Sequence, residues 1–454
     1  MWSLFALLPT LMPVLPPPPP DRDQPVLHEI VQRVDAKRLE GSIGTLVGFG
    51  TRHTLSDTTS PTRGIGAARG WVRATFEGYS AACGGCLAIE LPATTVRGER
   101  VPVPVRIENV LAVQRGTSDP DRVVIIAAHL DSRVSDPMDA SSDAPGADDD
   151  GSGVAAVLEA ARVLSRYKFA ATIVYAVLSG EEQGLYGGRL LAEVAEQKGW
   201  RVEADLNNDI IGNTHGLSGA VESGYVRVFS EGTKAQETAA HGADRRYHGG
   251  EVDSPSRQIG RYMADLADRY LAPFRVRMVY RTDRFGRGGD QTPLLEAGYP
   301  AVRLTEAAEN YHRQHQDLRT EGGVAYGDVA SALDFAYLAS VTRLNLVTLA
   351  SLASAPAPPE GVSVSGAVSA DTTLSWAASP GAAEYRVWWR DTTDPRWRNY
   401  RGAGPALSLR LEGVVIDDWF FGVQAVSADG FASPVVFPGP AGAFGREPAT
   451  PLPH

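Results

Sequence analysis

Runs of apolar residues alternate with amphipathic stretches through the first part of the chain, and this rhythm predicts an α/β fold. Val123–Ala128 is a continuous apolar run, which is typical of a strand buried on both faces of a sheet. An amphipathic helix is predicted over Gly153–Tyr167, a second buried strand over Thr172–Leu178 and a second helix over Gly188–Lys198. Asp205–Ile211 then has the pattern of a third strand. This β-α-β-α-β order implies a mainly parallel sheet with helices on both faces.

The flanking segments extend this pattern into one predicted domain. Val26–Glu77 has mainly helical spacing of apolar residues, and Val101–Val113 alternates as a strand does. Five further elements are predicted beyond the third strand. They are a helix at Ser254–Leu271, a glycine-rich loop at Arg284–Asp290, a short helix at Thr292–Glu296, a strand at Pro300–Thr305 and a long apolar helix at Asp328–Ala353. We expect residues 25–353 to form a three-layer α/β domain.

The pattern changes after a proline-rich linker at residues 354–360. Strand-like runs with Trp and Tyr recur without any helical stretch, and turn residues separate them: Thr373–Trp376, Tyr385–Trp389, Ala406–Leu411 and Trp419–Val426. Residues 361–440 are therefore expected to form a small all-β sandwich, followed by a tail at 441–454. The spacing of the runs resembles a fibronectin type III domain, which implies an accessory domain for contact with a surface or polymer.

Composition and the N-terminal segment indicate which partners and which cellular compartment to expect. Among 454 residues the formal net charge is -11, and no basic patch is present, which argues against nucleic acid as a partner. Residues 1–24 begin with an apolar stretch and continue into a proline run. This is the pattern of an export signal and a stiff leader, although a positively charged start and a clear cleavage site are missing. No later stretch is expected to span a membrane, and we expect a secreted or periplasmic protein.

The chain contains two cysteines, Cys83 and Cys86, separated by two glycines. This CxxC spacing fits a redox pair, half of a zinc site or a small disulfide. No second cysteine pair exists to complete a four-cysteine zinc site, and a local disulfide is the default in an exported protein. We therefore expect a small disulfide at this place.

Histidine and acidic residues gather at the ends of the predicted strands. In chain order they are His129 and Asp131, Asp148–Asp150, Glu181 and Glu182, Asp209, and His315. Singly, such residues are often solvated loop groups or helix N-caps. Together they would meet at the carboxyl edge of a parallel sheet, where adjacent carboxylates repel one another unless cations hold them. The set supplies what two zinc ions need: a bridging carboxylate, a histidine and a carboxylate for each ion, and an unliganded acid as general base.

Five motifs carry these residues: AAHLDS at 127–132, PGADDDGSG at 145–153, SGEEQGLYGG at 179–188, LNNDIIGN at 206–213 and a final histidine at 315. In this order they resemble the motifs of the dizinc aminopeptidases of peptidase family M28. The resemblance covers residues 25–352 and implies a zinc-peptidase-like fold, two Zn²⁺ ions and peptide substrates. Carboxylate and imidazole ligands also admit cobalt or manganese.

The resemblance implies a function for each residue by its position. It implies five metal ligands: His129, Asp149, Glu182, Asp209 and His315. Asp149 is expected to bridge the two metals and to precede a cis peptide bond to Asp150, while Glu181 is expected to be the catalytic base. Asp131 is expected to orient the ring of His129, as ligating histidines usually require.

Several nearby residues leave alternatives open. His312 competes with His315 as the last ligand, and the acid that follows two residues later favours His315. Gln291 stands where the family commonly has the histidine of an Asp-His pair, a difference that bears on the substrate side more than on the metals. Arg52 and His53 are expected to serve packing around the N-terminal helices.

The favoured reaction is hydrolysis of the N-terminal peptide bond of extracytoplasmic peptides, with a metal-bridging water and Glu181 as general base. A carboxypeptidase of the same fold is the nearest alternative, and it would need a cationic pocket from Arg284, Arg287 or Arg313 for the terminal carboxylate. A binding protein that kept the fold but lost catalysis is disfavoured by the intact Glu181 and ligand set. The paired acids likewise disfavour a single-zinc cyclase of related architecture.

Overall fold

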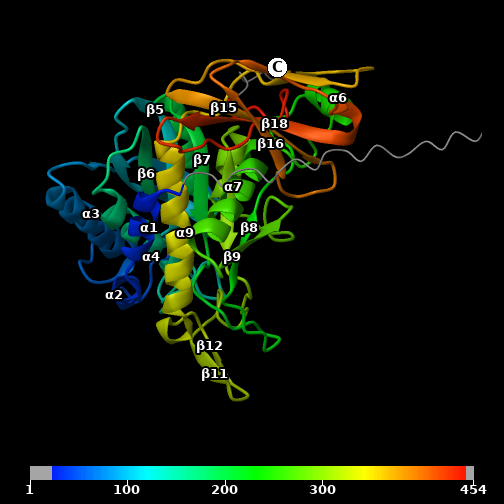
Figure 1. Cartoon of the computed structure of the whole chain (residues 1–454). Helices are drawn as coiled ribbons and strands as arrows, with labels where there is room; N and C mark the ends of the chain where they lie inside the picture. The colour runs from blue at the N-terminus through cyan, green and yellow to red at the C-terminus, as the bar shows by residue number, and fades with distance from the viewer. Residues whose placement is uncertain (1–22, 446–454) are drawn as a thin grey trace, which may run out of the picture.

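The computed structural model describes residues 23–445 and centres on an eight-stranded mixed sheet (Figure 1). Its strands lie in the order β1-β4-β6-β5-β7-β10-β8-β9. Their bounds are β1 Ala88–Glu90, β4 Val110–Gln114, β5 Asp119–His129, β6 Ala171–Leu178, β7 Arg201–Asn208, β8 Tyr225–Phe229, β9 Arg275–Val279 and β10 Ala301–Thr305. The central strands β6, β5, β7 and β10 run parallel, and antiparallel pairs flank them. Most of the predicted leader, and the tail after residue 445, lie outside the described residues.

Helices cover both faces of this sheet, which confirms the predicted three-layer α/β fold class. One face carries six helices: α1 Pro25–Gln32, α2 Ala36–Gly48, α3 Gly64–Ala82, α4 Gly151–Leu164, α7 Pro255–Tyr270 and α9 Phe335–Ser354. The other face carries α5 Tyr186–Gln197 and α8 Gln291–Glu296. Along β5, Val124 and Ile126 pack into the first core and Val123 and Ile125 into the second, because successive strand residues point to opposite faces. A continuous apolar run is therefore what a doubly covered strand requires.

Two predicted strands have different bounds in the structure. The expected strand over Val101–Val113 is two strands, β3 Val101–Glu108 and β4, because the chain leaves one sheet and enters another at Asn109. β3 pairs instead with β2 Ala93–Gly98 in a hairpin that the sequence pattern did not predict. Asp209 was placed inside the third strand, and this was wrong: β7 ends at Asn208 and Ile210 has a φ of 65°, so Asp209 lies in the turn beyond the strand.

The long apolar helix begins later than predicted. The side chain of Asp334 accepts hydrogen bonds from the backbone N–H groups of Ala336 and Tyr337, so α9 starts at Phe335 and not at Asp328. A 3-10 turn, η1 Ala330–Ala332, precedes it. Within residues 23–445, α9 has the length and apolarity to cross a membrane, which the sequence analysis did not anticipate. Its window is 78% buried beneath the neighbouring helices, as in the core helix of a globular domain.

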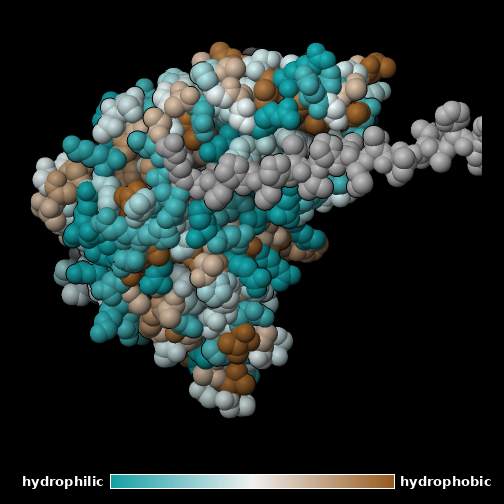
Figure 2. All heavy atoms as spheres, viewed as in Figure 1, coloured by the Kyte–Doolittle hydropathy of each residue, from teal (hydrophilic) through white to brown (hydrophobic). Residues whose placement is uncertain are grey.

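Two further elements were not predicted from the sequence. The helix α6 Ala239–His248 has no buried residue and lies beside the C-terminal strands (Figure 1). The strands β11 Arg319–Glu321 and β12 Val324–Tyr326 form a hairpin that projects from the end of the molecule opposite the C-terminal strands. Figure 2 shows hydrophobic atoms gathered on this projection, where Leu318 and Val324 are exposed. Cys83 and Cys86 form the expected local disulfide directly after α3.

The C-terminal part consists of two antiparallel three-stranded sheets, β13-β14-β17 and β16-β15-β18, that enclose a separate apolar core. The strands are β13 Ser363–Ser365, β14 Thr372–Ser375, β15 Ala382–Asp391, β16 Asn399–Gly404, β17 Ser408–Leu411 and β18 Trp419–Ser427, with a 3-10 turn η2 Ile416–Asp418. Trp376, Trp389 and Phe421 lie in the core between the sheets. The all-β character is as predicted, whereas the likeness to fibronectin type III and the domain boundaries stay predictions.

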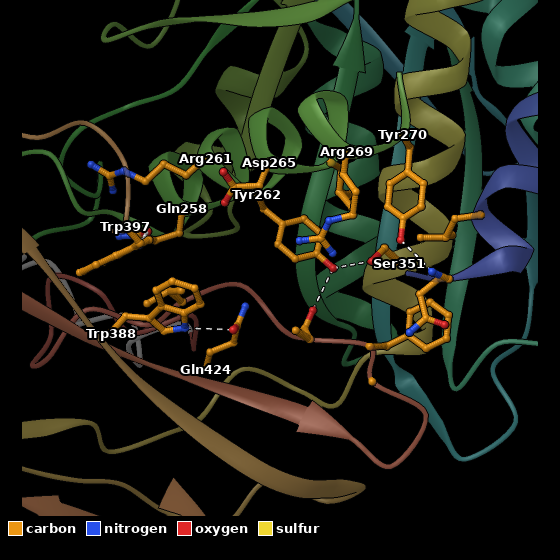
Figure 3. Close-up of a pocket in the computed structure, with 17 residues that line it drawn as sticks. Gln258, Arg261, Tyr262, Asp265, Arg269, Tyr270, Ser351, Trp388, Trp397 and Gln424 are labelled. Carbon is orange, nitrogen blue, oxygen red and sulfur yellow. Dashed lines mark hydrogen bonds between the residues drawn. The ribbon is translucent and has the colours of Figure 1, made fainter. Parts of the chain in front are cut away.

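The C-terminal sheets pack against the central sheet at the amino-terminal ends of its parallel strands, and against α7. Arg122, near the start of β5, donates a hydrogen bond of 2.5 Å to the carbonyl of Ala355 in the linker. Figure 3 shows the seam with α7, where Tyr262 donates to the carbonyl of Ala432 and Trp397 donates to the side chain of Gln258. The sheets therefore lie at the end of the strands opposite to their carboxyl termini.

A buried ion pair fixes this seam. Asp253 receives hydrogen bonds of 2.8–2.9 Å from Arg390 of the C-terminal sheets and one of 2.8 Å from Arg261 of α7. All three side chains are at most 2% exposed. One carboxylate thus binds guanidinium groups from both parts of the chain.

Removal of this carboxylate should destabilise the protein strongly. Asp253→Ala leaves two buried guanidinium groups without their acid, and we expect the free energy of unfolding in urea to fall by about 3–5 kcal/mol. The control is Glu29→Ala, which breaks the exposed pair of Glu29 with Arg33 at 2.7 Å and should change stability little. An Asp253→Ala protein as stable as this control would show that the seam does not depend on the ion pair.

Candidate metal centre

The carboxyl ends of the parallel strands bring the predicted ligands together. His129 is the last residue of β5, Glu181 and Glu182 lie in the turn after β6, and Asp209 lies in the turn after β7. Asp149 lies directly before α4, and its peptide bond to Asp150 is cis, as the resemblance implied. His315 comes from the loop after β10. Residues from five segments of the chain therefore meet at one edge of the sheet.

Asp149 lies between two groups of possible ligands. Its Oδ1 is 3.2 Å from Nε2 of His129, and its Oδ2 is 2.9 Å from Nε2 of His315. The first group unites ligand atoms of His129, Glu181 and Asp209, and the second unites those of Asp149, Glu182 and His315, each group within 4.8 Å. One carboxylate whose two oxygens face two imidazoles has the geometry of a bridging ligand.

The donor atoms fit zinc in kind as well as in position. Each group offers imidazole nitrogen and carboxylate oxygen, the ligands that divalent zinc takes in catalytic sites. Oε1 of Glu182 is buried, lies 3.0 Å from Nε2 of His315 and accepts no well-directed hydrogen bond. A buried oxygen of this kind is costly unless a cation satisfies it.

The same crowding displaces the pKa values of the ligands. Burial alone would lower the pKa of His315, but the carboxylates of Glu182 and Asp149 outweigh it and raise the pKa to about 10. The pKa of His129 is likewise well above its usual range, because Glu181 and Asp149 outweigh burial. Burial, together with the charges of Glu182 and Asp209, raises the pKa of Glu181 well above that of an ordinary glutamic acid. Without metal, the imidazoles of His129 and His315 therefore hold protons that a bound cation would displace.

Asp131 makes a different contact from the one expected. Its carboxylate is 3.8 Å from Nδ1 of His129, too far for a hydrogen bond, and the ring nitrogen lies 3.0 Å from the backbone carbonyl of Asp131 instead. The carboxylate accepts hydrogen bonds from the backbone N–H groups of Gly180, Glu181 and Glu182. Asp131 thus orients the imidazole through its main chain and the turn that carries the two glutamates through its side chain.

Two further buried acids hold the segment around Asp149. Asp150 accepts hydrogen bonds from the backbone N–H groups of His129 and Gly153, which ties the end of β5 to the start of α4. Asp328 accepts hydrogen bonds from the backbone N–H groups of Asp148 and Asp149 at 2.8–3.0 Å. The sequence analysis assigned Asp328 to a helix start and so missed this contact.

Arg303, in the middle of β10, is the second residue that sequence reasoning missed. Its guanidinium is fully buried, with Nη2 2.6 Å from Oδ1 of Asp209 and Nη1 3.3 Å from Oδ2 of Asp283. Gln291 donates to the same Oδ2 of Asp283 at 2.7 Å. An arginine in the otherwise apolar strand PAVRLT was the available signal, because a buried guanidinium requires a carboxylate.

Arg52 holds the loops of the site from behind, in keeping with the expected packing function. The side chain is fully buried and donates hydrogen bonds to the backbone carbonyls of Leu130, Pro145 and Gly146. It thereby joins the segment after His129 to the segment before Asp149.

A cavity of ≈ 360 Å³ opens onto the ligands. Asp149, Glu181 and His315 line it together with four arginines, Arg100, Arg133, Arg284 and Arg287. Of the three arginines considered from the sequence, Arg284 and Arg287 reach the cavity. Arg313 donates to the carbonyl of Gly327 instead and is not among the described lining residues. His312 packs against the ring of Tyr326 at 4.6 Å, so His315 is the histidine that faces the site.

Similarity to known proteins agrees with this geometry. The model of peptidase family M28 matches residues 109–332. A probable zinc metalloprotease of Leptosphaeria maculans is 43% identical over 418 residues, which are 91% of this chain and 97% of that protein. The chain belongs to peptidase family M28. The resemblance drawn from the motifs is thereby confirmed at the level of the family.

Other relatives extend this result. A probable zinc metalloprotease of Pyricularia oryzae is 43% identical to this M28 peptidase over 432 residues, which are 93% of this chain and 85% of that protein. These relatives support zinc as the metal. Among solved structures, the LapA aminopeptidase of Legionella pneumophila has a TM-score of 0.52 at 18% identity, covering 73% of this chain and 76% of that chain. At this identity the likeness shows a shared fold.

Zinc binding to this M28 peptidase should release protons. At pH 7, below the raised pKa of His315, the metal-free ring is protonated, so zinc must displace that proton and its affinity should fall as the pH is lowered. Calorimetry in two buffers of different protonation enthalpy should give different heats, corresponding to release of at least one proton.

The matched variants are His315→Ala and His312→Ala. The first removes the titrating ligand and should reduce both the zinc stoichiometry and the proton release. The second changes a histidine of the same loop that packs on Tyr326 and should change neither. Equal heats in both buffers for the unmodified protein would contradict the prediction.

Proposed function

We propose that this M28 peptidase is a dizinc aminopeptidase that acts on peptides outside the cytoplasm. The observation that carries the proposal is the position of Asp149, whose two carboxylate oxygens each face one histidine. His129 and Asp209 would hold one zinc ion with Asp149, and Glu182 and His315 would hold the second. When bound, the metals would polarise the scissile carbonyl and lower the pKa of water.

Glu181 is the residue we propose to move the proton. Glu181 lies within reach of the first ligand group, but Asp149 and Glu182 would serve one metal and Asp149 and Asp209 the other, which leaves Glu181 available as a base. It lines the cavity, and its backbone N–H is held by Asp131 at 3.2 Å. Burial raises the pKa of its carboxyl, which favours taking up a proton from water and returning it to the leaving amine.

Support for action outside the cytoplasm comes from the Cys83–Cys86 disulfide, since such bonds persist in oxidising compartments. The apolar, proline-rich start of the sequence agrees with export. We further propose that the C-terminal sheets contact a surface or polymer. Their position at the far end of the central strands would leave the catalytic cavity accessible during such contact.

A carboxypeptidase is the second candidate, and one observation favours it. Arg284 and Arg287 line the same cavity as Asp149 and Glu181 and could receive a terminal carboxylate. Binding of a peptide by its carboxyl end would then replace binding by its amine.

The variant Glu181→Gln tests the proton transfer. We expect it to keep the fold and bound zinc, because glutamine is isosteric, and to lose about 10²–10⁴-fold in kcat, the usual contribution of a general base. The control Glu193→Gln changes an exposed glutamate of α5 and should retain full activity. Turnover by Glu181→Gln within a few-fold of the unmodified protein would remove Glu181 from the mechanism.

Mass spectrometry of free and N-acetylated peptides tests the direction of cleavage. Zinc-loaded protein should shorten only peptides with a free N-terminus, one residue at a time, and a chelator should stop the reaction. Stepwise shortening of N-acetylated peptides from the carboxyl end would instead establish the carboxypeptidase. A zinc-loaded protein that cleaves neither set would contradict the proposal that it is a peptidase of these types.

A further inference from the structure

The charge of the catalytic cavity is unusual once the metals are considered. Its described lining contains four carboxylates, those of Asp149, Glu181, Glu182 and Asp209. Two divalent cations would balance these four negative charges. The lining also contains four guanidinium groups, which that balance leaves over. Glu309 and Asp283, which pair with these arginines from behind the lining, offset two of the four positive charges. The zinc-loaded cavity would keep the remaining positive charge, which favours an anionic group in the substrate.

Arg284 and Arg287 contact no proposed metal ligand, whereas the other two arginines of the lining do. Arg100 and Arg133 contact the backbone carbonyl and the carboxylate of Glu182, at 3.0 and 2.9 Å, so they brace the metal site. Arg284 and Arg287 come from the glycine-rich loop and contact Glu309 instead, and Arg284 also pairs with Asp283 at 3.2 Å. They form a separate basic wall of the cavity.

Glu309 anchors this wall but does not neutralise it. Its Oε2 lies 3.3 Å from Arg284 and 2.9 Å from Arg287, while its Oε1 lies 2.6 Å from Arg227. One carboxylate thus serves three guanidinium groups. Burial would raise the pKa of Glu309, but these arginines lower it to about 2, so the carboxylate is charged throughout the physiological range. Glu309 and Arg284 are 5% and 8% exposed, whereas Arg287 is 31% exposed, so Arg287 is the guanidinium of this wall that a ligand in the cavity can reach.

Arg287 keeps hydrogen-bond donors for a ligand. Apart from the bond to Glu309, its side chain contacts Oε1 of Gln314 at 3.4 and 3.5 Å, near the limit for a hydrogen bond. A guanidinium has five N–H donors in a planar fork that matches a carboxylate. The side chain is 31% exposed, so this fork is accessible from the cavity.

We propose that Arg287, with Arg284 beside it, binds a carboxylate of the substrate close to the scissile bond. The ligand class is a short peptide whose carboxylate is either its free C-terminus or an acidic side chain. The inference rests on the proposed function, since it concerns the same cavity. It assigns selectivity to the glycine-rich loop, which directly precedes Gln291 at the start of α8.

The test measures binding without turnover. Zinc-loaded Glu181→Gln protein is titrated calorimetrically with Leu-Ala and Leu-Ala-amide, and with Leu-Glu-amide and Leu-Gln-amide. We expect one or both carboxylate ligands to bind about tenfold or more tightly than the matched neutral ligand, as for a hydrogen bond to a charged group. Preference in the first pair identifies the terminal carboxylate, and preference in the second identifies the side chain.

Adding Arg287→Gln should abolish the preference, and Arg287→Lys should restore part of it. The control Arg281→Gln changes an exposed arginine of the preceding segment that packs on Phe285 and should leave the preference intact. Equal binding of acid and amide ligands, or a preference that persists in Arg287→Gln, would overturn the inference, since the metals would then be what binds the carboxylate. Failure of the unmodified enzyme to hydrolyse any peptide would defeat the proposed function alone, because this binding does not depend on turnover.

Discussion

The gathering of negative charge in one cavity is the constraint on which this structure depends. Asp149, Glu181, Glu182 and Asp209 line the same space, and like charges repel strongly where water is partly excluded. The chain balances them with two imidazoles and with guanidinium groups such as that of Arg303, which is buried against Asp209. Such a cluster is costly in the protein alone and becomes favourable when divalent cations complete it. The site is therefore arranged for metal before any substrate arrives.

Acids that do not face the metals fix the loops that do. Asp131, Asp150 and Asp328 each direct their side chains at backbone N–H groups of the ligand-bearing turns. A carboxylate held by two or three N–H groups is satisfied without a cation. The orientation of the side chain thus separates the candidate metal ligands from the acids that position them. The carboxylates of the first set face the cavity, and those of the second set face backbone N–H groups.

Much of this arrangement follows from local sequence pattern. Continuous apolar runs predicted β5 and β6 because strands covered on both faces bury every side chain. His129, Glu181 and Glu182 stood out as candidate ligands because they end or closely follow such runs, whereas Asp149 and His315 lie in loops and were assigned from the motifs. The partners of Asp209 and Asp149 could not be predicted in the same way. Arg303 and Asp328 act on residues far away in the sequence, and periodicity carries no information about such pairing. The start of α9 was misplaced for a local reason, since the cap at Asp334 competes with an apolar pattern that begins earlier.

The two ends of strand β5 lie in different environments. Arg122 near its start contacts the linker to the C-terminal sheets, and His129 at its end faces the candidate metal centre. The intervening residues span roughly 23 Å at about 3.3 Å per residue, which exceeds the Debye length of about 8 Å at physiological ionic strength. Charged groups acquired or lost on the outer face of the C-terminal sheets are consequently screened from the catalytic residues. Substitutions on that face can therefore change its charge without changing the electrostatics of the candidate metal centre.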